Sequence, residues 1–168
     1  MCIRDRYTSA YELADIWLFE EMAPQAAPDQ MMQKMAPGIQ ITAVKQIPLK
    51  YPSLQSVTSS ARYVAAPFEA PKMTDLSHRV EQLLAEQSLI RERKRGKGKV
   101  KRYDLRPLIV ELASDSDRYG DTILKMTLLL MSGKTGRPDE VLAALDLDPL
   151  AARIHRTFIT LVEPDPSS

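Results

Sequence analysis

The chain has 168 residues, 44% of them apolar, which is enough to bury one substantial core or two small cores that share an interface. Its formal net charge is only +1, but eight cationic residues gather between positions 91 and 102, so the local field matters more than the total. One cysteine, Cys2, excludes an internal disulfide. The chain has only two histidines, His78 and His155, so a metal or iron–sulfur site held by this chain alone is also not expected.

Targeting signals are not apparent in the sequence. No apolar run reaches the roughly 18 to 20 residues that are needed to cross a bilayer. The N-terminus also lacks the apolar stretch followed by small residues that marks a secretory signal. We therefore expect a cytoplasmic protein that makes no membrane contact.

The first six residues, "MCIRDR", are expected to be a sequencing artefact. They back-translate as ATG TGT ATA AGA GAC AGA or AGG, which reproduces the mosaic-end sequence of transposase-based libraries. Residues 1–6 are therefore left out of the fold prediction. On this interpretation Cys2 is not native, and the chain is a fragment truncated at its N-terminus.

Residues 7–57 are predicted to contain a strand, a helix and a strand. The stretch "AYELADIWLF" (10–19) is aromatic-rich and partly alternating, which favours a strand. "APDQMMQKMAPG" (27–38) offers Pro28 at a first helical position, and "IQITAVKQI" (39–47) alternates again. This pattern predicts the C-terminal half of a truncated ferredoxin-like unit.

Residues 58–163 are predicted to form a complete ferredoxin-like domain, because their elements follow the order β-α-β-β-α-β. The fold class is therefore α+β, with a disordered tail over 164–168. The first helix is expected from Asp75 to about Ser88 with Thr74 as its cap. The other elements are "SARYVAA" (60–66), "KRYDLRPLIVEL" (101–112) and "DTILKMTLLLM" (121–131) as strands, "RPDEVLAAL" (137–145) as a helix, and "RIHRTFITLV" (153–162) as the last strand.

Four stretches carry a resemblance to a known family: "YELADIWLFEEM", "PGIQITAVKQIPLKYPSLQS", "KRYDLRPLI" and "TGRPDEVLAALDLDPLAARIHRT". Between Tyr11 and Val162 the chain resembles the radical SAM-linked, or radical SAM-associated, proteins of uncharacterised function. Members carry a further upstream segment, with histidine and a Gly-Phe-Asn-Pro stretch, that is absent here.

The resemblance implies a bacterial cytoplasmic protein encoded beside, or fused to the end of, a cobalamin-binding radical SAM protein. The iron–sulfur cluster, S-adenosylmethionine and cobalamin would then belong to that partner, and this chain would hold no cofactor. Members of the family are often encoded near genes for RNA processing and ribosomal proteins, which hints at an RNA context.

The basic segment "RERKRGKGKVKRYDLRPLI" (91–109) is the main candidate for RNA contact. We expect a flexible electropositive arm, bent at Gly96 and Gly98, that follows a phosphate backbone. Tyr103 is expected to stack on a base and Arg106 to bind a phosphate in bidentate fashion. Docking to an acidic protein partner and a merely solvated loop stay open as alternatives. The cations of the arm are Arg91, Arg93, Lys94, Arg95, Lys97, Lys99, Lys101 and Arg102.

Two further motifs contain candidate functional residues. "SGKTG" (132–136) matches the end of a phosphate-binding loop, but Leu128 stands where that motif requires glycine, which argues against nucleotide hydrolysis. The alternatives are a plain turn or an anion site with Lys134 and Arg137 at the start of the next helix. In "IHRT", His155 and Arg156 suggest either a hydrogen-bonded strand-end pair or a general acid for RNA cleavage, for which the sequence offers no accompanying base.

The sequence therefore predicts a non-catalytic accessory module of a radical SAM enzyme, which binds RNA through its basic arm. One alternative is an adaptor whose arm docks on the enzyme itself, and another is an RNA-processing enzyme of ferredoxin-like fold. No catalytic residue and no metal ligand is assigned.

Overall fold

The computed structural model describes residues 7–94 and 100–163; for Lys94 and Lys101 it describes the backbone only. The predicted artefact (1–6), the middle of the basic segment (95–99) and the predicted tail (164–168) lie outside the described residues. The chain divides into two compact units, one of residues 14–53 and the other of the residues up to Leu13 together with those from Leu54 onward.

The unit of residues 14–53 is mostly irregular. Its helix α1 (Ala27–Met32) confirms the predicted helix, with Pro28 in the first turn. The strands predicted over 10–19 and 39–47 are wrong, because both stretches lack regular structure. Trp17 and Phe19 are 71% and 109% exposed, so the apolar residues of the alternating pattern have no buried surface to pack against.

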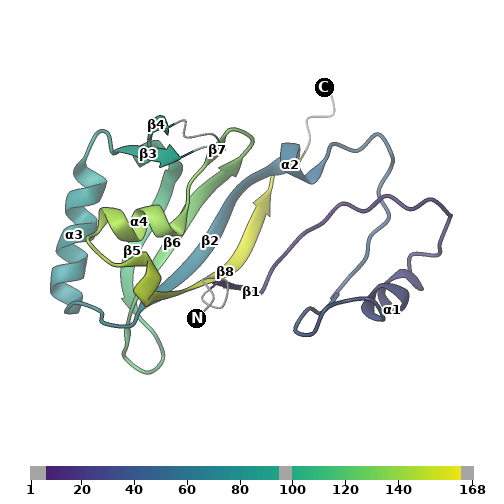
Figure 1. The fold of residues 1–168 in the computed structure, drawn as a ribbon, viewed down its shortest axis with the longest axis horizontal. Coiled ribbons are helices and arrows are strands. Elements are labelled where there is room, and N and C mark those ends of the chain that lie inside the picture. The colour runs from purple at the N-terminus through teal and green to yellow at the C-terminus, as the bar shows by residue number, and fades with distance from the viewer. Residues whose placement is uncertain (1–6, 95–99, 164–168) are drawn as a thin grey trace. The chain divides into compact units, whose positions relative to one another are not determined.

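The other unit is built on an antiparallel sheet (Figure 1). Its strands lie in the order β1-β8-β2-β6-β5, and the short β7 pairs with β6. Among the described strands of this sheet, only β1 runs parallel to its neighbour, β8. The strands are β1 (Tyr7–Ser9), β2 (Thr58–Pro67), β5 (Ile109–Ser116), β6 (Thr122–Met131), β7 (Lys134–Thr135) and β8 (Ala152–Leu161).

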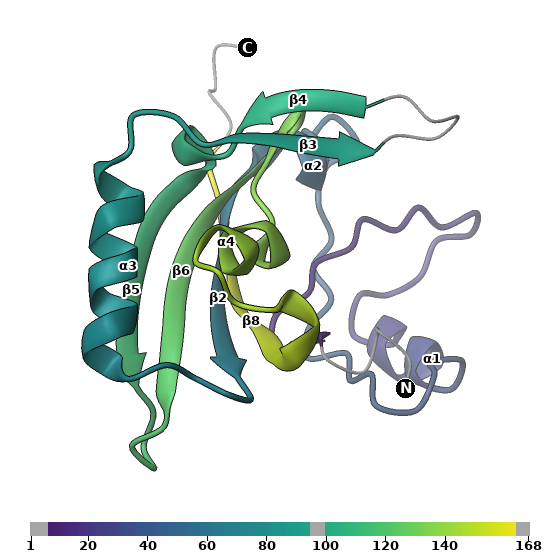
Figure 2. The ribbon, with the colours of Figure 1, turned by 60° about the vertical axis from the view of Figure 1, so that its left-hand side comes forward.

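Two helices, α3 (Met73–Ala85) and α4 (Pro138–Ala144), cover one face of this sheet (Figure 2). The predicted cap at Thr74 is wrong, because α3 starts after Lys72 and has no side-chain cap. Short helical turns complete the unit: α2 (Leu54–Val57), η3 (Arg106–Leu108) and η4 (Pro149–Ala151). The core lies between helices and sheet and contains Leu76, Val80, Leu83, Leu124, Met126, Leu128, Val141, Leu142, Leu145 and Ile154.

Strand β6 contributes several side chains to the core. Leu124, Met126 and Leu128 face the helices, while Ile123 and Thr127 are also nearly inaccessible on the opposite face. On that opposite face Lys125 is exposed, so β6 is buried mainly on the face toward the helices. The strand predicted over 121–131 is confirmed.

The basic segment forms part of a separate two-stranded sheet, inserted between α3 and β5. Its strands β3 (Ile90–Lys94) and β4 (Val100–Asp104) pair in antiparallel fashion, and we call them the hairpin. The single strand predicted over 101–112 is wrong, because η3 separates β4 from β5. Pro107 explains the break, since proline fixes φ and has no N–H for a sheet ladder. The flexible arm expected here is, over its described residues, a regular β-ribbon.

The mixed α+β class predicted from the sequence is confirmed. The long strands and the two longer helices of the second unit follow the expected β-α-β-β-α-β order, with the hairpin as an insertion. The ferredoxin-like assignment itself stays a prediction. Within the described part of the chain, no helix is both long enough and apolar enough to span a bilayer.

Candidate nucleic-acid interface

The hairpin presents two different faces. Glu92 pairs with Arg102 across the strands, and Arg91 pairs with Tyr103. Because successive residues of a strand point to opposite faces, Glu92 and Arg102 share one face and Arg91 and Tyr103 the other. Arg102 and Glu92 lie 3.7 Å apart (Nε to Oε1) with side chains 73% and 63% exposed, so their face is the solvated one.

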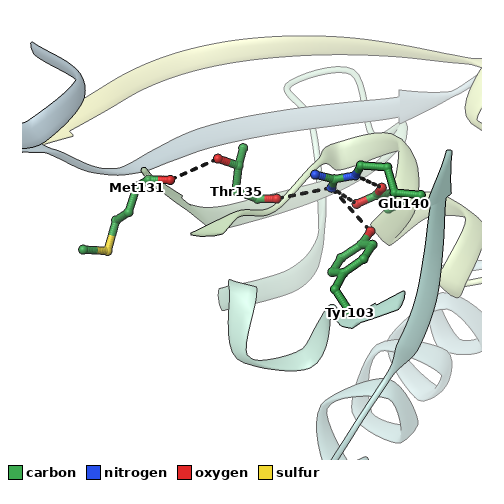
Figure 3. Close-up of polar contacts among 5 residues, drawn as sticks. Tyr103, Met131, Thr135 and Glu140 are labelled. Carbon is green, nitrogen blue, oxygen red and sulfur yellow. Dashed lines mark hydrogen bonds and ion pairs between the residues drawn. The ribbon is translucent and has the colours of Figure 1, made fainter. Parts of the chain in front are cut away.

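The inner face of the hairpin is fixed by Arg93. Its Nε donates to Oε1 of Glu140 at 3.1 Å, and its Nη2 donates to Oε2 at 2.8 Å (Figure 3). Glu140 lies in the first turn of α4, where the helix dipole favours a carboxylate. The two side chains are only 26% and 17% exposed, so this bidentate pair is partly shielded from solvent. We call it the Arg93 anchor.

Tyr103 and Thr135 complete the anchor. The Arg93 guanidinium lies 4.7 Å from the centroid of the Tyr103 ring, and Nη2 also donates to the Tyr103 hydroxyl and to the Thr135 carbonyl, both at 3.4 Å (Figure 3). Burial, followed by the nearby carboxylate of Glu140, raises the pKa of Tyr103 to about 12. The phenol therefore stays protonated, and able to donate, at pH values above its ordinary pKa of 10.0.

The turn that joins β6 to β7 lies next to the anchor. Gly133 has a φ of +76°, which glycine adopts without steric cost, so its role in "SGKTG" is to close a two-residue turn. The Thr135 hydroxyl donates to the Met131 carbonyl at 3.2 Å (Figure 3). The anion alternative for this motif gains no support, because α4 is short and carries Asp139 and Glu140 in its first turn.

A hollow of about 430 Å³ opens between the hairpin and this turn. We call it the hairpin hollow. Lys134 is exposed beside it, and Arg93 and Tyr103 form part of its wall. Its lining residues are Arg93, Tyr103, Asp104, Pro107, Leu108, Leu129, Gly133, Lys134 and Thr135.

Arg106 has a structural position. Its Nε and Nη2 donate to the Leu84 carbonyl at 3.3 and 3.0 Å, and its Nη1 donates to the Ile109 carbonyl at 3.4 Å. Leu84 is at the end of α3, where carbonyls lack partners within the helix. The guanidinium expected to bind phosphate is thus used to close a helix end.

His155 and Arg156 are neighbours on β8 and point to opposite faces of the sheet. His155 Nδ1 lies 2.7 Å from the Thr8 hydroxyl, as the strand-end interpretation expects. Arg156 forms an ion pair with Glu12 beside a second hollow of about 320 Å³. Burial raises the pKa of Tyr63, while Arg156 acts to lower it.

Of the other residues predicted to contact RNA, some lie within the described part of the chain and some lie outside it. Arg137 is exposed immediately before α4, and Arg91 is half-buried in β3. Arg95, Lys97 and Lys99 lie outside the described residues, as do the side chains of Lys94 and Lys101.

Sequence reasoning missed Glu140, Glu12 and Tyr63. No local pattern identifies Glu140 as the partner of Arg93, because the two residues are 47 positions apart. A search of the described residues for three or more His, Cys, Asp or Glu side chains placed to hold a metal ion finds no such group.

Comparison with known proteins identifies a family for the chain. A family model described as an uncharacterised protein conserved in bacteria (DUF2344) matches residues 7–138. No curated protein and no solved structure matches the chain. The resemblance is therefore confirmed at the level of an uncharacterised bacterial family.

Proposed function

The chain belongs to the DUF2344 family of uncharacterised proteins conserved in bacteria, and we propose that its hairpin binds RNA. The observation that carries the proposal is a separation of charge. Residues 91–102 hold eight of the 23 cationic and one of the 22 acidic residues, so they carry a net +7 and the rest of the chain a net −6. A phosphate backbone is attracted to the first group and repelled by the second.

The Arg93 anchor supports this role, because an isolated two-stranded hairpin is only marginally stable in water. With its inner face held by Glu140 and Thr135, the hairpin offers the exposed Arg102 on a fixed frame. A binding surface that is already ordered loses less conformational entropy when it binds.

The partner we propose is a radical SAM enzyme, on the strength of the sequence resemblance. The iron–sulfur cluster, S-adenosylmethionine and cobalamin would be held by that enzyme in the cytoplasm. This chain would then act as a non-catalytic accessory module that presents RNA to the enzyme.

A protein–protein adaptor is the second candidate, and one observation favours it. Trp17 and Phe19 are 71% and 109% exposed in the unit of residues 14–53. Large aromatic side chains are enriched at the energetic centres of protein interfaces. An adaptor would use such side chains, with or without the hairpin, to hold the enzyme.

A salt titration separates these candidates. The test variant replaces Arg95, Lys97, Lys99 and Arg102 with alanine and keeps Arg93, so the anchor stays intact. For single-stranded RNA the plot of log K against log salt has a negative slope, and each lost phosphate contact reduces its magnitude by about 0.7. The loss of four contacts therefore reduces the magnitude by about 3. The matched control removes four cations elsewhere: Lys34, Lys45, Lys50 and Lys72.

The proposal expects weaker binding to many RNA sequences alike for the test variant and unchanged binding for the control. Full RNA affinity in the test variant, together with loss of the radical SAM partner in a pull-down, would establish the adaptor instead. Cleaved RNA in reactions of the unmodified chain would favour an RNA-processing enzyme.

A further inference from the structure

We propose that the hairpin hollow binds one unstacked base of a single-stranded RNA. The inference rests on the proposed function and names the part of the RNA that the protein holds most closely. It is carried by the composition of the hollow and by its position beside the cationic hairpin.

The size of the hollow suits one nucleotide. Its volume of about 430 Å³ lies within the range of about 300 to 1,000 Å³ that is usual for small-molecule sites. Pro107, Leu108 and Leu129 give it an apolar part. A base has apolar faces and a polar edge, so such a lining favours the base over the sugar or the phosphate.

The wall of the hollow contains the two side-chain types on which bases stack. The Arg93 guanidinium and the Tyr103 ring lie 4.7 Å apart and are held together by the anchor. Proteins that bind single-stranded RNA commonly stack its splayed bases on aromatic rings and on arginine planes. Because Glu140 already orders Arg93, a base meets a prepared surface.

Charge within the hollow assigns the phosphate to the rim. Asp104 lines the hollow, and its Oδ1 accepts from the backbone N–H groups of Leu89 and Arg106 at 2.7 and 3.0 Å. These bonds lower the pKa of Asp104, so it is ionised and opposes a phosphate in the interior. Lys134, exposed at the start of β7, offers the cation that a phosphate at the rim needs.

The first test uses 5′-mononucleotides, with ribose 5-phosphate as the matched ligand without a base. NMR spectra of the full chain are recorded at millimolar concentrations of each. We expect AMP, GMP, CMP or UMP to shift the methyl signals of Leu108 and Leu129, and ribose 5-phosphate to leave them in place. Equal shifts from ribose 5-phosphate would overturn the inference, because the hollow would then bind the phosphate alone.

The second test uses variants against a single-stranded RNA. Tyr103→Leu removes the ring and should weaken binding about 5- to 150-fold with little change in salt slope. Tyr103→Phe keeps the ring and should bind nearly as well, which separates stacking from loss of the hydroxyl. Lys134→Ala should lower the salt slope by about 0.7. Equal affinity for the leucine and phenylalanine variants would refute the stacking.

The two proposals fail in different ways. Suppose that the variant with alanine at positions 95, 97, 99 and 102 loses its affinity for RNA, while no mononucleotide shifts the methyl signals of Leu108 and Leu129. The base site is then wrong and the hairpin interface stands. If mononucleotides bind but that variant keeps full RNA affinity, the hairpin proposal is wrong and the base site stands.

Discussion

The Arg93 anchor gives the most direct test of how the hairpin is held. We consider Arg93→Met, which keeps the apolar stem, and Glu140→Gln, which keeps the shape of the side chain. Hydrogen bonds to charged groups contribute about 1.5–3 kcal/mol each, whereas exposed ion pairs contribute about 0.2–1 kcal/mol. The side chains of this bidentate pair are 26% and 17% exposed. We therefore expect the pair to contribute about 1–2 kcal/mol to the stability of the hairpin, between the two ranges.

The assay is amide hydrogen exchange in a double-mutant cycle. The coupling energy between the two substitutions should appear in the opening of β3 and β4, about 5- to 30-fold in the opening equilibrium. Amides of β6, which lies in the core, should change much less. Glu92→Gln with Arg102→Met is the matched control, because that pair is 3.7 Å apart and exposed. Its coupling should stay below about 0.5 kcal/mol. Equal coupling in the two cycles would refute the reasoning.

Three further changes test other parts of the fold. Gly136→Ala should lower the free energy of unfolding in urea by about 1–3 kcal/mol, because the alanine Cβ would lie 3.0 Å from the Leu108 carbonyl oxygen. An unchanged free energy would mean that the backbone between β7 and α4 moves to make room for the Cβ. Arg106→Ala should destabilise the protein by about 1–2 kcal/mol through the unpaired Leu84 carbonyl, and unchanged RNA affinity of the folded variant would support its structural role. The pKa of Tyr103, raised to about 12 from 10.0, means that its contribution to stability is complete below about pH 10 and is lost as the pH rises towards 12. Tyr103→Phe should therefore flatten the fall of the unfolding free energy over that interval, and an unchanged slope would contradict the raised pKa.

Local pattern was sufficient for the central elements. The apolar stretch at 121–131 predicted β6 and "RPDEVLAAL" predicted α4, because the burial of a strand and the start of a helix depend on residues that are close in sequence. The alternation at 10–19 misled, since a strand also needs a neighbour for its N–H and C=O groups. The observed β1 lies just before it, at Tyr7–Ser9, where β8 supplies that neighbour.

The candidate site divides in the same way. Its charge was visible in the sequence, because eight cations in twelve residues need no fold to be counted. The tertiary structure alone decided which cations are available: Arg93 is bound by a carboxylate 47 positions away and Arg106 by a carbonyl 22 positions away. The hairpin hollow likewise exists only because β4, η3 and the β6–β7 turn meet in space. Hydrogen-bond partners distant in sequence are chosen by packing, and no periodicity within a segment records them.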